Sequence, residues 1–249
     1  MPPSRKPSDY TRTSERAEQE LCRRSAQYFI FESRHLMTKD EHDTRNPVKP
    51  FPQEPYLRAV LDALLVSGRC LHPEDAKFAQ GAGWDLLWLL ASREAGILAI
   101  EKSRQMMVTW LVCAYLLWRM KTYPHQLLLV QSKREDDAAN LVFNKEPHVA
   151  RMSFLEAHLP RHLRSMAFPR AGAYGRLYDR NGSQAWAIPE GGDIIRSNSP
   201  SVVFSDESAF QPEFGASYTA ALPAIKGGGQ YICVSSAEPG EFQALVEAT

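Results

Sequence analysis

Two adjacent carboxylates follow an apolar run late in the sequence. The segment 201–205 leads directly into Asp206 and Glu207. If this segment is a strand of a parallel sheet, its carboxyl end lines the ligand crevice. One carboxylate there can hold hydrated Mg²⁺, and the next can orient the water that attacks a γ-phosphate. The same pair also fits a strand followed by a helix cap, so the pair alone leaves both interpretations open.

A second candidate lies upstream, from Lys102 to Thr109, where the sequence is KSRQMMVT. A phosphate-binding loop needs converging backbone N–H groups, a cation for the β and γ oxygens, and a hydroxyl for Mg²⁺ at the start of a helix. Compared with GxxxxGK[ST], the segment keeps the hydroxyl of Thr109 but neither glycine, and Lys102 occupies the first glycine position. By itself, this segment favours a charged surface turn.

A third candidate is the pair Ser235 and Ser236, which ends the apolar run 230–234. Hydroxyls beside a nucleotide can sense the γ-phosphate, although serines at a strand end more commonly form a turn. All three candidates follow apolar segments, in the order phosphate loop, carboxylate pair and hydroxyl pair. One ATP-hydrolysing site explains that order better than three separate coincidences.

The elements around these residues predict an α/β fold with a mainly parallel sheet covered by helices on both faces. Apolar runs predict strands at 97–100, 126–131, 184–188, 194–196, 201–204 and 230–234. Helical spacing predicts helices from Pro55 to Ser67, from Val108 to the stop at Pro124, and at 135–143 and 216–224. Residues 1–13 are expected to be disordered, a helix to begin at Ser14, and 38–52 to form a linker.

The composition is that of a globular protein, with 44% hydrophobic and 23% charged residues among 249. Lysine plus arginine equals aspartate plus glutamate, which weighs against a protein that coats nucleic acid. The four cysteines lack metal-ligand spacing, so idle thiols are expected. No apolar run reaches membrane-spanning length and the N-terminus does not resemble a signal peptide, so an intracellular protein without membrane contact is expected.

Four stretches together resemble a known family. The segments KSRQMMVTWLVCAYLLW, LLLVQSKREDDAANLVF, SVVFSDESAF and YICVSSAEPG are similar, in this order, to the ATPase domain of tailed-phage terminase large subunits. The resemblance covers about residues 46–245 and implies a P-loop NTPase of the ASCE type. It implies a helical N-terminal arm and linker at 1–45 and an ATPase domain at 46–249. The chain ends twelve residues after Ala237, so it is expected to stop before the family's nuclease domain.

The resemblance also implies roles for individual residues. Cofactors would be ATP and Mg²⁺, with Thr109 and Asp206 as metal ligands and Glu207 and Arg104 as catalytic residues. Nucleotide-binding positions would be Lys102, Ser103, Gln105, Met107, Thr109, Gln53, Ser235 and Ser236. Tyr56 is a further candidate beside the adenine. Among Arg170, Arg176, Arg180 and Arg196, one could reach a neighbour's nucleotide, and Arg196 resembles an arginine that the family often keeps.

Partners implied by the resemblance are double-stranded DNA, copies of the chain in a ring, the portal protein and the small terminase subunit, in the host cytoplasm. The function would be translocation of DNA into a capsid. Met107 departs from the pattern because it stands where the family usually has glycine. It supports an alternative, a non-catalytic terminase-derived nucleotide-binding or assembly protein. If left-handed backbone is needed there, Met107→Gly is expected to tighten ATP binding.

Overall fold

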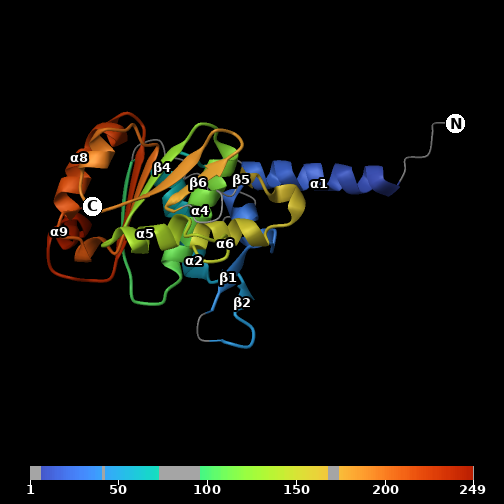
Figure 1. The fold of residues 1–249 in the computed structure, drawn as a ribbon, viewed down its shortest axis with the longest axis horizontal. Helices are drawn as coiled ribbons and strands as arrows, with labels where there is room; N and C mark the ends of the chain where they lie inside the picture. The colour runs from blue at the N-terminus through green and yellow to red at the C-terminus, as the bar shows by residue number, and fades with distance from the viewer. Residues whose placement is uncertain (1–6, 41–42, 73–95, 168–173, 249) are drawn as a thin grey trace.

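A seven-stranded sheet forms the centre of the molecule (Figure 1). The computed structural model describes residues 7–40, 43–72, 96–167 and 174–248. In spatial order the strands are β3 (Ile97–Glu101), β9 (Gln230–Ser235), β8 (Val202–Asp206), β4 (Leu127–Gln131), β7 (Gln184–Ile188), β6 (Arg176–Asp179) and β5 (Met166–Ala167). The first five are parallel, and β6 and β5 continue the sheet antiparallel. The prediction of an α/β fold with a mainly parallel sheet is confirmed.

The order of the strands brings three strand ends to one edge of the sheet. Strand β9 lies between β3 and β8, although it comes last of the three in the sequence. In register, Glu101 pairs with Ser235, and Asp206 pairs with Val234. The loops that follow β3, β8 and β9 therefore emerge side by side at the carboxyl edge.

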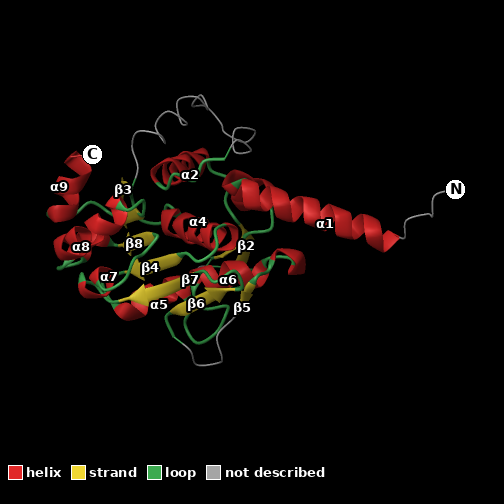
Figure 2. Cartoon of the chain, turned by 90° about the horizontal axis from the view of Figure 1, so that it is seen from above, coloured by secondary structure: helices red, strands yellow, loops and turns green. Residues whose placement is uncertain are grey.

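Helices cover both faces of the sheet (Figure 2). On one face lie α2 (Pro55–Ser67), α4 (Val108–Thr122), α5 (Glu135–Val142) and α6 (Arg151–His158). On the other lie α7 (Asp193–Arg196), α8 (Phe214–Lys226) and α9 (Glu241–Ala248). Strand side chains alternate between them, since Val202 and Phe204 belong to the first core and Val203 to the second. Every residue from Leu111 to Met120 is buried, which explains why this part of α4 is apolar on all sides except at Arg119.

The N-terminal region differs from the prediction in two respects. Helix α1 begins at Pro7 rather than at Ser14, and it extends away from the body in both views (Figures 1 and 2). Its last turn is held by Trp118, whose Nε1 donates to the Cys22 carbonyl at 2.9 Å. The predicted linker contains the antiparallel strands β1 (Met37–Lys39) and β2 (Val48–Pro50), preceded by the π-helix η1 (Tyr28–Glu32). Pro50 fits a strand end, where its missing N–H costs nothing.

Other elements were predicted with mixed success. The helix predicted from Pro55 to Ser67 is confirmed, and the strand predicted at 126–131 begins one residue later. The strand predicted at 194–196 is wrong, because Arg196 N donates to the Gly192 carbonyl at 2.9 Å and forms the short helix α7. Strands β5 and β6 and helix α6 were not predicted. No helix in the described ranges is both long and apolar enough to cross a bilayer.

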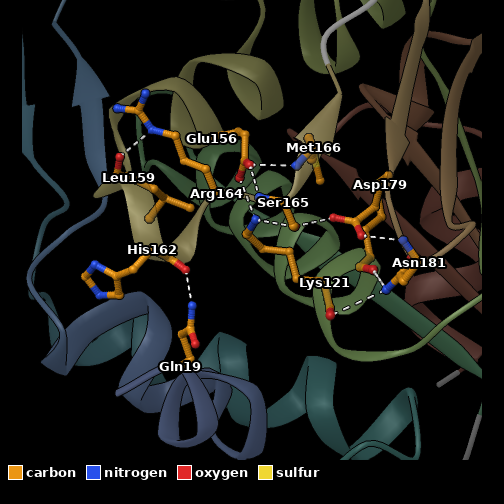
Figure 3. A network of polar contacts seen from close by, with 11 residues as sticks. Gln19, Lys121, Glu156, Leu159, His162, Arg164, Ser165, Met166, Asp179 and Asn181 are labelled. Carbon is orange, nitrogen blue, oxygen red and sulfur yellow. Dashed lines mark hydrogen bonds and ion pairs between the residues drawn. The ribbon is translucent and has the colours of Figure 1, made fainter. Parts of the chain in front are cut away.

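A buried polar network fixes α6 and the end of α4 (Figure 3). The carboxylate of Glu156 is fully buried and pairs with Lys121 Nζ at 2.7 Å. Its other oxygen accepts from the backbone N–H groups of Ser165 and Met166 at 2.8 and 2.9 Å. Lys121 Nζ also donates to Ser165 Oγ at 2.7 Å, and that hydroxyl donates to Asp179. The network holds α6, whose first residue faces the site described next.

Candidate functional site

The loop from Lys102 to Met107 connects β3 to α4 at the carboxyl edge. Two of its residues have positive φ, Gln105 at 62° and Met107 at 55°. Met107 occupies the N-cap position of α4 with φ 55° and ψ 6°, and its side chain makes no capping hydrogen bond. A residue with a Cβ is strained in the left-handed region, by on the order of 1–2 kcal/mol. The loop thus has the backbone shape that glycine usually supplies, although it contains no glycine.

Thr109 and Asp206 meet across this edge. Thr109 lies in the first turn of α4, and its Oγ1 donates a hydrogen bond to Asp206 Oδ1 at 3.0 Å. Asp206 is the last residue of β8. The two proposed metal ligands, far apart in the sequence, are therefore in direct contact in the folded chain.

Burial changes the acidity of Asp206. Its side chain is buried, and loss of hydration raises its pKa to about 6. The charge of Arg151, the hydrogen bond from Thr109 and the charge of Lys102 act in the opposite direction, while nearby Glu207 raises it further. Among the described residues, the one side-chain donor that bonds to this carboxylate is the hydroxyl of Thr109. Asp206 is thus a buried acid with an incomplete set of partners, and a cation would complete it.

Glu207 follows in a strained conformation and is exposed. Its backbone is left-handed, with φ 54° and ψ 39°, at the start of the 3₁₀ turn η4 (Ser208–Phe210). It lines an open cleft of about 370 Å³. The other residues that line the cleft are Ser132, Arg134, Asp137, Asn140, Leu141, Arg151 and Asp206. Strained non-glycine residues of this kind persist only where the surrounding structure holds them, and they concentrate at active sites.

Arg151 is a member of the site that sequence reasoning missed. It begins α6, and its guanidinium lies 5.7 Å from the centre of the Trp110 ring. Its positive charge is the largest influence that lowers the pKa of Asp206. A basic residue close to the predicted helix of 135–143 was the available signal, but helix α6 itself was not predicted.

The remaining loop residues divide into two groups. Lys102 is half-buried and close enough to Asp206 to lower its pKa. Ser103, Arg104 and Gln105 are exposed along the rim of the loop. The fold thus places Lys102 near Asp206, and it leaves Arg104 on the surface of the loop.

Ser235 connects the loops after β3 and β8. Its carbonyl accepts from the backbone N–H of Lys102 at 2.9 Å, and its Oγ accepts from the N–H of Ala209 at 3.2 Å. It is buried, and Ser236 beside it is half-buried. A displacement of either loop would therefore disturb a hydrogen bond of Ser235.

The upstream segment reaches the site through Tyr56 rather than through Gln53. Tyr56 Oη donates to the Met106 carbonyl in the loop at 3.0 Å. Gln53 instead donates to the carbonyls of Phe31 and Phe51 at 3.3 and 3.2 Å. Its Oε1 accepts from Arg58 at 3.0 Å. The amide of Gln53 thus ties η1 to α2, while Tyr56 contacts the nucleotide-binding candidate loop.

The basic residues before the carboxylate strand lie elsewhere. Arg176 stacks on Trp186, with its guanidinium carbon 4.4 Å from the ring centre. Arg180 is exposed in the turn after β6. Arg196 is exposed on α7 and pairs with Asp193 at 3.1 Å. Arg170 lies outside the described residues. The structure brings none of the three described arginines into the cleft that contains Glu207.

Comparison with solved structures finds phage packaging proteins. The Thermus phage P74-26 large terminase ATPase domain is 16% identical, with a TM-score of 0.40 over 60% of this chain and 61% of that chain. The HK97 bacteriophage large terminase is 17% identical, with a TM-score of 0.46 over 75% of this chain and 34% of that chain. The chain is similar in structure to phage large terminases.

A third similar structure is the large terminase of a thermophilic bacteriophage in complex with ADP, with 17% identity and a TM-score of 0.44. The match covers 70% of this chain and 38% of that chain. The chain thus spans between about a third and three fifths of the terminase chains described here. No protein-family model matches the sequence, and no curated protein matches it.

Proposed function

We propose that this chain is the ATPase motor domain of a viral terminase large subunit, which couples ATP hydrolysis to the movement of double-stranded DNA into a capsid. The observation that carries the proposal is the hydrogen bond of 3.0 Å between Thr109 and Asp206. It joins a loop and helix start suited to phosphates with the carboxylate end of a neighbouring strand. Residues predicted separately for one site are in contact, which supports a single nucleotide site.

The residues at the carboxyl edge fit Mg²⁺ bound to a nucleotide. Mg²⁺ prefers hard oxygen ligands and is commonly held by one or two carboxylates together with substrate phosphates and water. Thr109 Oγ1 and Asp206 Oδ1 are such oxygens, and Asp206 is short of donors for its buried charge. Thr109 and Asp206 would hold the ion, which when bound supplies charge neutralisation for the phosphates.

The chain's own residues would divide the remaining work. Glu207, which lines the cleft, would orient the attacking water and accept a proton from it. Lys102 and Arg104 would neutralise negative charge on the phosphates while the γ-phosphoryl group passes to the attacking water and ADP leaves. The backbone of the loop from Ser103 to Met107 would surround those phosphates. Ser235, which bonds to both loops, would couple the chemistry to movement together with Ser236.

Steady-state hydrolysis of Mg·ATP, with and without double-stranded DNA, tests this proposal. Thr109→Val removes the hydroxyl but keeps the size and branching of the side chain. It is expected to weaken Mg-dependent nucleotide binding by roughly tenfold, since one charge-assisted bond is lost. Thr122→Val is the matched control, because Thr122 lies on the same helix and its hydroxyl bonds to the Arg23 carbonyl at 3.4 Å. Equal binding by both variants would contradict the assignment of the site.

The biological setting belongs to the same proposal. The partners would be double-stranded DNA, further copies of this chain in a ring, the portal protein and the small terminase subunit, in the host cytoplasm. A neighbouring subunit would supply an arginine to the cleft, and Arg196 is exposed on α7. The hydrolysis rate per subunit should then rise with protein concentration. A rate that stays flat from dilute to concentrated protein would contradict a shared site.

A further inference from the structure

The strained backbone at Glu207 is held from behind by a buried glutamine. Gln211 Nε2 donates to the Asp206 carbonyl at 2.8 Å and to Ser205 Oγ at 3.0 Å. The Asp206 carbonyl belongs to the peptide group that precedes Glu207, so its orientation helps to set the φ angle of Glu207. Gln211 thus bonds to the peptide whose rotation would release the left-handed conformation.

The other side of Glu207 is held as well. Its carbonyl accepts from the Phe210 N–H at 2.9 Å, within the 3₁₀ turn. Ser208 adds a second anchor, because its Oγ donates to the Ser205 carbonyl at 2.8 Å. The peptide before Glu207 depends on a side chain, whereas the carbonyl after it depends on the backbone. A substitution at Gln211 therefore reaches one of the two restraints selectively.

Gln211 is itself held by a glutamine of the adjacent strand. Gln131 ends β4, pairs in register with Ser205, and its Nε2 donates to Gln211 Oε1 at 2.7 Å. With Oε1 engaged in this way, the Gln211 amide must present its two N–H groups to Ser205 and Asp206. Gln131 is fully buried and Gln211 nearly so. Gln131 Oε1 has no hydrogen-bond partner among the described residues, so Gln131 supports Gln211 through its Nε2 alone. Buried hydrogen bonds in series polarise one another, which strengthens the hold on Gln211.

We propose that Gln211 is a positioning residue that holds the Asp206–Glu207 peptide so that the Glu207 carboxylate faces the cleft, with Gln131 as its support. The proposal rests on the ATPase function proposed above. Gln211 touches neither nucleotide nor water in this role. It acts through the backbone of Glu207, and its loss changes the geometry of the carboxylate without removing any group that binds phosphate.

The test compares Gln211→Met with Gln230→Met. Methionine has a similar length and no hydrogen-bonding amide. Gln230 is a matched control, because it is also buried but begins β9, at the opposite end of the strands from the site. It bonds to Tyr115, Arg119, Leu64 and Ser67. Both variants lose a buried glutamine, so both are expected to unfold at a lower temperature. Only one of them removes the restraint on Glu207.

Gln211→Met is expected to lower kcat by about 100-fold, as a misplaced catalytic group does. Its affinity for Mg·ADP, measured by calorimetry, should stay within about threefold of wild type, because no phosphate contact is lost. Gln230→Met should keep kcat within about twofold. A folded Gln211→Met protein with wild-type kcat, or an equal loss of kcat in Gln230→Met, would overturn the proposal.

Hydrogen exchange gives a readout that needs no hydrolysis. Amides of 205–211 should exchange roughly tenfold faster in Gln211→Met than in wild type, since about one hydrogen bond of local protection is lost. They should not change in Gln230→Met. Unchanged exchange in Gln211→Met would contradict the positioning role. If Gln211→Met exchanges faster than wild type as expected, but wild-type protein hydrolyses no ATP, the proposed function fails. The restraint of the Asp206–Glu207 peptide by Gln211 would still stand.

A second variant covers the case in which Gln211→Met does not fold. Gln131→Met leaves both donors of Gln211 in place and removes only their support. It should accelerate exchange of 205–211 and lower kcat, each by less than the loss expected for Gln211→Met. Exchange and kcat equal to wild type in a folded Gln131→Met protein would show that the amide chain does not orient Glu207.

Discussion

Asp206 and Glu156 are both buried carboxylates, but the chain surrounds them differently. Glu156 has an ion pair with Lys121 at 2.7 Å and two backbone N–H donors (Figure 3). Asp206 bonds to the hydroxyl of Thr109 and has the charges of Arg151 and Lys102 nearby, but among the described residues it has no ion-pair partner, and burial raises its pKa to about 6. A carboxylate whose partners are all within the chain stabilises the fold. A buried carboxylate without a direct ion pair is unfavourable until a bound cation supplies one.

The two regions also differ in backbone strain. Met107 and Glu207, which flank Thr109 and Asp206 in the sequence, both have left-handed conformations. The Glu156 network instead connects the ends of regular elements, namely α4, α6 and β5. Among the described residues, three of the seven non-glycine residues with positive φ thus lie at the carboxyl edge of the sheet beside Asp206, namely Gln105, Met107 and Glu207. This is the distribution expected when a scaffold is stable enough to support an unfavourable functional site.

Glu207→Gln should have the largest effect on function. The amide keeps the shape of the side chain but cannot accept a proton, so kcat should fall by about 10²–10⁴-fold with little change in ATP affinity. Stopped-flow hydrolysis and equilibrium titration measure the two quantities. Glu213→Gln is the control, because Glu213 is an exposed carboxylate in the adjacent loop. Equal turnover in the two variants would remove Glu207 from the mechanism.

Lys121→Met should have the largest effect on stability. It leaves the Glu156 carboxylate buried without its cation, which costs about 3–5 kcal/mol of unfolding free energy in comparable cases. Denaturant unfolding measures the loss, and nucleotide affinity of the protein that remains folded should be unchanged. A loss below about 1 kcal/mol would indicate that water or rearrangement satisfies Glu156, and the contrast with Asp206 would then be weaker.

Asp206→Asn should instead raise the free energy of unfolding of the nucleotide-free protein. The folded-state pKa of about 6 lies above the usual 3.8, so the folded state binds more protons than the unfolded state between these values. Stability is therefore lost as pH rises from about 4 through 6. The asparagine variant avoids this loss and should be more stable at pH 8, by up to roughly 3 kcal/mol, since one pKa unit is about 1.4 kcal/mol.

Thermal unfolding in EDTA at several pH values checks this expectation. The advantage of Asp206→Asn should disappear near pH 4, where the aspartate is protonated in the folded state. The same variant should lose Mg-dependent nucleotide binding, because an amide is a poor Mg²⁺ ligand. Wild-type protein that is the more stable of the two at pH 8 would contradict the idea that Asp206 lacks a partner.

The sequence predicts the central layers well, and physical reasons explain where it fails. Apolar runs such as 126–131 are sufficient for buried parallel strands, and Pro55 marks the start of α2. Strands β5 and β6 are short and lie at the sheet edge, so they carry little periodicity. The segment 194–196 contains two isoleucines and resembles a strand, but α7 is a single turn whose form depends on contacts with α8.

The site is predictable to a similar extent. Thr109, Asp206 and Glu207 follow from motifs because the motifs are local in the sequence. Arg151 and Gln211 do not, because their importance depends on which elements the fold places beside β8. The hydrogen bonds of Gln53 likewise arise from tertiary packing against η1 and α2.

Met107→Gly should have the smallest effect, and the structure changes what the sequence predicts for it. The sequence favours tighter ATP binding, on the premise that nucleotide forces Met107 into a strained conformation. In the folded chain Met107 has a left-handed backbone, at φ 55°. The strain of about 1–2 kcal/mol is then a cost of folding and not of binding. Glycine would remove the strain, but it would also raise the entropy of the unfolded chain, at a comparable free-energy cost to folding. It would further remove the contacts of a half-buried side chain with the core.

For Met107→Gly we expect Mg·ATP affinity within about threefold of wild type and a net change in unfolding free energy below about 1 kcal/mol. Calorimetric titration and denaturant unfolding of the two proteins measure both values. Tightening by more than about tenfold would mean that the loop closes further around the nucleotide, and that strain at Met107 opposes this step.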